Sequence, residues 1–227
     1  FVLCNLETHD PQCRYWANHS GCIVVSVDYR LAPEHKFPAA VEDCFATILW
    51  ISEYGNTIGI DRDRIAIGGE SAGGNLAAVV AQLSKSVANT TILLQVLSVP
   101  ITDMRFEDPS NWTYATGYGL EHASLKWFRE NYLNDDSEID DPRASPLKTN
   151  NLGELPSALV ITAGFDPLRD QGRAYADRMT LAQVPVEYVC FEGMPHPFVG
   201  WGGRAPIVLD YMDVITTKLR KTLVDSV

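Results

Sequence analysis

The stretch Ile65-Ala66-Ile67-Gly68-Gly69-Glu70-Ser71-Ala72-Gly73-Gly74-Asn75 decides the fold of the chain. An apolar run leads into Gly-x-Ser-x-Gly, and apolar residues then recur at helical spacing at Leu76, Val79, Val80 and Leu83. This order predicts a strand, a sharp turn and a helix, with Ser71 raised from the sheet as a nucleophile. Gly-x-Ser-x-Gly alone arises by chance in about one chain in twenty of this length, so the strand and helix around it carry the argument.

The neighbours of this serine suit a nucleophilic turn. Gly69 and Gly73 leave room for close backbone packing, and the backbone N–H of Ala72, at a helix start, can stabilise a tetrahedral oxyanion. Glu70 is expected to hold the turn in shape rather than to transfer protons. The glycine cluster, which Gly74 completes, lacks the Gly-Lys-Ser/Thr ending of a phosphate-binding loop, so we expect no nucleotide there.

Composition narrows the class of protein. The 227 residues suit one α/β domain over residues 1–227 with a substantial core, and no apolar run approaches the length of a membrane span. With 18 Lys and Arg against 29 Asp and Glu, the net charge of −11 argues against a nucleic-acid partner. The odd number of cysteines, five without Cys-x-x-Cys spacing, predicts buried free thiols in a reducing compartment, and we expect a cytoplasmic protein.

Strand and helix patterns alternate along most of the chain. They predict a mostly parallel, doubly wound sheet with helices on both faces. The apolar runs expected as strands are residues 22–29, 64–68, 91–99, 158–163 and 186–191. Helices are expected over residues 8–18, from Pro38 to near Gly55, after Ser71 to about residue 86, after Asp166 to about residue 183, and at the C-terminus.

Residues 103–155 break this alternation. They are rich in Asn, Asp, Pro and Tyr, with one clear helix around residues 122–132 and no convincing strand. In such sheets ligands bind beyond the carboxyl ends of the strands. We therefore expect this segment to be a cap that lies over those ends and shapes substrate choice.

A base for Ser71 has to come from one of five histidines, which are His9, His19, His35, His122 and His196. Only His196 sits directly after a predicted strand and before the C-terminal helix, which places it at the same sheet edge as Ser71. His35 is better explained by the loop that enters the Pro38 helix, and His122 by the surface of the insertion.

An acid is needed to orient the base. Asp166 comes immediately after a predicted strand, where its carboxylate can reach across, whereas Asp170 lies one helical turn further and fits favourable placement in a helix start. Asp166 is preferred, which gives the order Ser, Asp, His of α/β-hydrolases. Asp28 is expected to serve a structural hydrogen bond. The His and Cys residues lack metal-ligand spacing, so no metal and no cofactor are expected.

Six ordered motifs resemble the hormone-sensitive-lipase family of α/β-hydrolases. They are Gly-Glu-Ser-Ala-Gly-Gly-Asn at 69–75, Asp-Tyr-Arg-Leu-Ala-Pro-Glu-His at 28–35, Phe-Pro-Ala-Ala at 37–40, Ser-Pro-Leu at 145–147, Asp-Pro-Leu-Arg-Asp at 166–170 and Gly-Met-Pro-His at 193–196. The resemblance covers nearly the whole chain. It implies hydrolysis of carboxylic esters with short or medium acyl chains, a triad of Ser71, Asp166 and His196, and a cap over the acyl pocket.

The sequence also departs from that family. Its members carry a His-Gly-Gly-Gly stretch that supplies most of the oxyanion hole, and this sequence begins where that stretch would end. The family's first strands, one of them beside the strand that carries the serine, are absent too. We therefore expect either that the sequence is a fragment of a longer protein or that another strand or chain fills the gap in the sheet. The backbone N–H of Ala72 is then the remaining donor to the oxyanion. Gln171 stands where an acid is usual.

The leading hypothesis is a serine carboxylesterase acting on a small-molecule ester. An amidase or peptidase would use the same triad. The alternative from another functional class is a non-catalytic member of the family that binds a ligand, as the plant gibberellin receptors do after losing the catalytic histidine. The presence of His196 in this sequence argues against that alternative, whereas the absence of the oxyanion glycines argues for it. Because family members often pair through the last strand and C-terminal helix, association of copies into a homo-oligomer is a further expectation.

Overall fold

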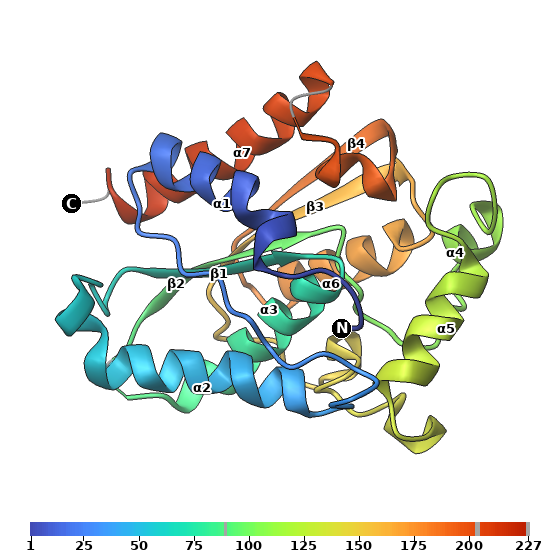
Figure 1. Cartoon of the computed structure of the whole chain (residues 1–227), viewed down its shortest axis with the longest axis horizontal. Coiled ribbons are helices and arrows are strands. Elements are labelled where there is room, and N and C mark those ends of the chain that lie inside the picture. The colour runs from blue at the N-terminus through green and yellow to red at the C-terminus, as the bar shows by residue number, and fades with distance from the viewer. Residues whose placement is uncertain (89, 203–204, 226–227) are drawn as a thin grey trace.

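A parallel sheet of four strands runs through the centre of the molecule (Figure 1). The computed structural model describes residues 1–88, 90–202 and 205–225. The strands are β1 (Ile65–Glu70), β2 (Ile92–Ser98), β3 (Ser157–Phe165) and β4 (Val186–Pro195), in the spatial order β1-β2-β3-β4. All three strand pairs are parallel. The prediction of a parallel sheet connected by helices is therefore confirmed.

Helices cover both faces of this sheet. On one face α1 (Leu6–Ser20) and α7 (Pro206–Leu223) pack together, and on the other lie α3 (Ala72–Leu83) and α6 (Arg169–Leu181), with α2 (Ala39–Tyr54) outside α3 (Figure 1). The centre of β3 is fully buried between these layers, which explains why it reads as a continuous apolar run. None of the helices in the described ranges is both long and apolar enough to cross a membrane.

The segment between β2 and β3 folds as helices and loops. It holds α4 (Pro109–Thr113), α5 (His122–Tyr132) and the short 3₁₀ turns η3 (Asp136–Glu138) and η4 (Pro146–Lys148). Other 3₁₀ turns are η1 (Gly55–Ile58), η2 (Ser84–Ser86) and η5 (His196–Gly200). Helix α5 begins and ends at the residues expected from the sequence, and no described residue of 103–155 belongs to a strand. The apolar side chains Leu125 and Tyr132 anchor α5 in the core that α2 and α3 share.

The prediction of a first strand over residues 22–29 is wrong. This run has no hydrogen-bonded neighbour in the described sheet, and Ile23 and Val25 are 60% and 46% exposed. A strand needs a partner for its backbone groups, and the apolar pattern supplies only side chains that favour one. The strand that carries Ser71, β1, pairs only with β2 and is an edge of the described sheet.

The prediction that the cysteines are free thiols is confirmed, but the prediction that they are buried is not. All five are free thiols. None of them is fully buried, however, since Cys4 is exposed and the other four are half-buried. The odd number of cysteines correctly indicated free thiols. The apolar residues next to them in the sequence did not indicate how far each side chain is buried.

Candidate active site

Ser71, Asp166 and His196 meet at the carboxyl edge of the sheet. Each directly follows a different strand: β1, β3 and β4. The Oγ of Ser71 lies 3.1 Å from Nε2 of His196, and Nδ1 of His196 lies 2.8 Å from Oδ2 of Asp166. The structure thus brings together the three residues that the sequence singled out, in one continuous chain of hydrogen bonds.

The backbone at Ser71 has the strained geometry of a strand-to-helix turn. Its φ of 54° and ψ of −112° lie outside the usual regions for a residue with a side chain, at a cost of about 1–3 kcal/mol. Hydrogen bonds on both sides hold it there: its N–H donates to Ser98 O at 2.9 Å, and its carbonyl accepts from Asn75 N at 3.0 Å. Sheet and helix together therefore fix the direction of the Ser71 hydroxyl.

The glycines beside Ser71 differ in how much space a side chain would have. A Cβ on Gly69 would lie 2.4 Å from the backbone carbon of Gly73, and one on Gly74 would press on Pro100 at 3.0 Å. A Cβ on Gly73 would meet nothing within 4 Å. A glycine was expected to be needed for close packing at both positions, but only Gly69 needs it, because its Cα packs against the backbone of Gly73.

Gly69→Ala is accordingly expected to lower the free energy of unfolding by about 3 kcal/mol, because backbone rather than a flexible side chain has to move. Gly73→Ala is the matched control, and it should be neutral or stabilising because its methyl group enters open space in a helix. Urea unfolding of the two variants measures the difference. Equal losses in both would contradict this account of the turn.

Asp166 is fully buried and its carboxylate is held from two sides. Oδ1 accepts from the backbone N–H of Leu168 at 2.8 Å, and Oδ2 faces His196. The alternative acid, Asp170, is engaged elsewhere: its Oδ2 accepts from Ser110 N at 2.9 Å and its Oδ1 from Arg169. Of the two carboxylates weighed from the sequence, only Asp166 is hydrogen-bonded to His196.

The environment of His196 sets its protonation. Burial of the imidazole lowers its pKa, but the charge of Asp166, the hydrogen bond to it and the charge of Glu70 outweigh burial, so the pKa of His196 lies above its ordinary value of 6.5. In the neutral ring, Nδ1–H donates to Asp166 and Nε2 is left to accept the Ser71 proton. This is the tautomer that a general base needs.

The N–H of Ala72 is available at the turn. Ala72 is the first residue of α3, and its N–H donates no hydrogen bond to any residue that the structure describes. Such orphan donors at a helix start attract negative charge. Among the described residues, Ser71, His196 and Asp166 are therefore joined by hydrogen bonds beside a backbone N–H that has no hydrogen-bond partner.

The structure corrects the placement of His122. Expected on the surface, it is only 8% exposed, and its ring contacts that of Trp112 in a tilted arrangement with centroids 4.4 Å apart. Its backbone N–H donates to Ala115 O at 3.0 Å, which folds the start of α5 back onto the chain after α4 and buries the ring. His35, by contrast, lies in the loop before α2, as expected, and is exposed.

Sequence reasoning missed two supporting contacts. His9 reaches Glu70, the residue before Ser71, with its Nε2 2.9 Å from Oε1. Gln171, fully buried, accepts through Oε1 from the backbone N–H groups of Thr102 and Asp103 at 2.5 and 2.9 Å. Neither contact has a local sequence signal, because the partners are 61 and about 69 residues apart.

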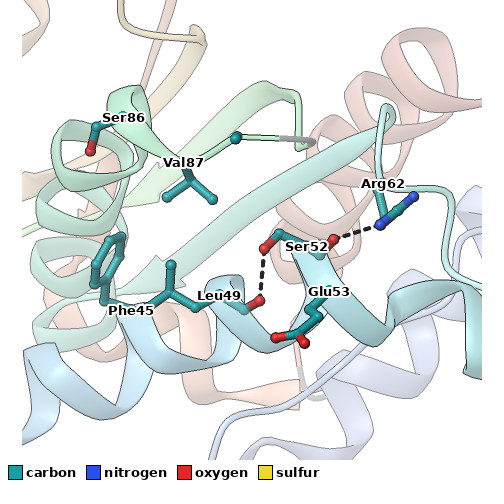
Figure 2. A pocket seen from close by; sticks show the side chains of 8 residues that line it. Phe45, Leu49, Ser52, Glu53, Arg62, Ser86 and Val87 are labelled. Carbon is teal, nitrogen blue, oxygen red and sulfur yellow. Dashed lines mark hydrogen bonds between the residues drawn. The ribbon is translucent and has the colours of Figure 1, made fainter.

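A hollow of the surface lies away from these residues. A pocket of about 490 Å³ is formed by α2, the loop before β1 and the chain around η2 (Figure 2). Arg62, on its rim, donates to the carbonyl of Ser52 at 2.6 Å. None of its described lining residues is a histidine, so it pairs no serine with a base. Within the described ranges, no cluster of three or more His, Cys, Asp or Glu side chains is suited to a metal ion.

Comparisons with known proteins agree on the family. A family model described as α/β-hydrolase fold matches residues 1–200. The chain is 40% identical to Esterase LipI of Mycobacterium tuberculosis over 91% of this chain and 65% of LipI, and 40% identical to an arylesterase of Saccharolobus solfataricus over 88% and 65%. It thus spans just under two thirds of the length of these relatives.

A solved structure is similar over almost the whole chain. The thermostable carboxylesterase EstE1, cloned from a metagenomic library, superposes with a TM-score of 0.95 at 41% identity, covering 98% of this chain and 76% of EstE1. The family model, the relatives and the solved structure thus agree on sequence and fold. The chain therefore belongs to the hormone-sensitive-lipase family of α/β-hydrolases.

Proposed function

We propose that this chain is the catalytic part of a serine carboxylesterase for short- to medium-chain carboxylic esters, with Ser71, His196 and Asp166 as its triad. The observation that carries the proposal is the hydrogen-bonded chain from Ser71 Oγ through His196 to Asp166, at 3.1 and 2.8 Å. Relatives named esterase and arylesterase support ester hydrolysis as the reaction class.

The proposed reaction has two halves. Ser71 Oγ attacks the ester carbonyl carbon while His196 Nε2 takes its proton, and the tetrahedral intermediate then expels the alcohol, which receives that proton from His196. Water, deprotonated by the same Nε2, next attacks the acyl-enzyme and releases the acid with Ser71 restored. Asp166 keeps the His196 tautomer and stabilises the imidazolium in both halves. The Ala72 N–H is the proposed donor to the oxyanion.

Residues 103–155 are the proposed cap. The α4 segment is fixed to the turn that carries Asp166, because Ser110 Oγ and Asn111 Nδ2 both donate to the carbonyl of Pro167 at 2.7 and 2.8 Å. Further along, Gly119 lies so close to Pro197, the residue after His196, that a Cβ there would be 2.6 Å from its ring. These contacts support a role for the segment in shaping the entrance to the triad.

A pH profile follows from the environment of His196. Its pKa is raised, so the ring stays protonated, and cannot act as a base, up to a pH above 6.5. The value of kcat/KM is expected to rise with pH along an acid limb whose midpoint lies above 6.5. Initial rates between pH 5 and 9 measure this limb, and a midpoint clearly below 6.5 would contradict the assigned base.

Hydrolysis of p-nitrophenyl butyrate by the 227-residue chain, with Ser71→Ala as the control, tests the proposal. A rate well above the control supports the esterase. A rate equal to the control, combined with ligand binding, supports the non-catalytic alternative for this chain. Comparing matched esters and amides separates a carboxylesterase from an amidase, since the triad does not fix the leaving group.

A further inference from the structure

A second hydrogen-bonded network lies directly behind the nucleophile. His9 Nε2 is 2.9 Å from Glu70 Oε1, and Gln12 Nε2 is 3.4 Å from Glu70 Oε2. The same Gln12 nitrogen donates to the carbonyl of Val199 at 2.7 Å, within η5, the turn that begins at His196. Helix α1 therefore contacts both the residue before Ser71 and the turn that carries the base.

The hydrogen bonds around His9 indicate a doubly protonated ring. The Thr8 hydroxyl has one hydrogen, which it donates to Asn5 O at 2.8 Å, and it accepts from Asn5 N at 3.1 Å. His9 Nδ1, 2.9 Å from the same oxygen, then has to donate, while Nε2 donates to the Glu70 carboxylate. In agreement, the hydrogen bond to Glu70 outweighs burial, and with the Glu70 charge it raises the pKa of His9.

On the basis of the proposed function, we propose that His9, assisted by Gln12, is a positioning residue for the reaction: it fixes the Glu70 side chain behind Ser71 and supplies the positive charge that balances Glu70 near His196. Both partners are partly shielded from water, with 31% and 19% of their side chains exposed, so the pair is only partly screened.

The charge of Glu70 reaches several groups. Besides His9, it acts electrostatically on four other titratable side chains and helps to raise the pKa of each: Cys13 in α1, Tyr29, His196, and Tyr211 in α7. By Coulomb's law, a positive charge on His9 beside Glu70 opposes this effect at His196. Removing either charge of the pair should therefore move the titration of the base, in opposite directions.

His9→Gln keeps a hydrogen-bond donor but removes the positive charge, so the midpoint of the His196 titration is expected to rise by about 0.5 pH unit. Glu70→Gln removes the negative charge, and the midpoint is expected to fall by about the same amount. His19→Gln, on the same helix with its ring stacked on Tyr15, is the matched control. It should shift the midpoint by less than about 0.1 unit.

Nitrogen-15 NMR of the histidines in the 227-residue chain measures these midpoints and the protonation of His9 without any turnover. Opposite shifts, with both His9 nitrogens protonated at pH 7 in the unmodified chain, support the inference. Unchanged midpoints, shifts in one common direction, or a neutral His9 at pH 7 would overturn it. Thermal unfolding checks that each variant folds, and if His9→Gln does not, the protonation of both His9 nitrogens in the unmodified chain still tests the inference, since a neutral His9 would overturn it.

Kinetics then separate the two proposals. The acid limb of kcat/KM should follow the NMR midpoints, whereas a contact that only holds α1 in place would lower rates without moving the limb. Absence of ester hydrolysis in every variant, with opposite NMR shifts still present, would refute the proposed function alone. Hydrolysis with unmoved midpoints would refute only the role of His9.

Discussion

His196→Ala is expected to lower kcat for ester hydrolysis by about 10⁴–10⁶-fold, the largest effect of any single substitution along with loss of Ser71. Without the imidazole nothing accepts the Ser71 proton, because Nε2 at 3.1 Å is the only base hydrogen-bonded to Oγ among the described residues. Steady-state hydrolysis of p-nitrophenyl butyrate measures the loss. The KM should change far less than kcat, since the ring acts mainly in the transition state.

His35→Ala is the control for this experiment. His35 is exposed in its loop and should leave the rate within a few-fold of the unmodified chain. If His196→Ala retained more than about a tenth of the rate, or if His35→Ala lost as much, the assignment of the base would be refuted.

Asp166→Asn is expected to lower kcat by about 10⁴-fold. The amide keeps the shape of the buried side chain, but its NH₂ group can face His196 Nδ1 only if that nitrogen becomes the acceptor, which puts the proton on Nε2 and blocks it as a base. The carboxylate that balances the imidazolium is lost as well. The reaction rate at pH 8 and the pH dependence of the remaining activity measure both consequences.

Asp170→Asn is the matched control. It also removes a carboxylate near the start of α6, but one that binds Ser110 and Arg169 instead of His196. We expect less than a tenfold loss of kcat, with a measurable loss of stability from the weakened contact to α4. A larger loss in Asp170→Asn than in Asp166→Asn would reverse the assignment of the acid.

Much of the fold could be predicted because local pattern and tertiary environment agree. Strand β3 is buried on both faces, so its sequence is apolar throughout, and α5 has its apolar positions on one face against the core. The meeting of Ser71, Asp166 and His196 was predictable for a related reason. Parallel strands bring their carboxyl ends to one edge, so a serine, an aspartate and a histidine that each follow a strand have to be close.

The errors arose where the outcome depends on a contact outside the residue's own helix or strand. Residues 22–29 have strand-like composition, yet no described strand lies beside them to pair with. His122 is buried by a backbone hydrogen bond to Ala115 and by a tilted ring contact with Trp112, and helical periodicity does not predict either contact. The contact of His9 with Glu70 depends on how α1 packs relative to β1, and no local sequence motif around either residue predicts it.

The most direct test of the central claim is covalent labelling of the 227-residue chain with a serine-directed alkyl fluorophosphonate, followed by peptide mapping. The phosphonate needs only the Ser71 nucleophile and the His196 base, so it reports on the triad independently of acyl or alcohol preference. We expect one phosphonyl group per chain, on the peptide containing Ser71, with no label in Ser71→Ala and a rate at least about 10²-fold lower in His196→Ala. A label on another serine, or equal rates with and without His196, would contradict the account.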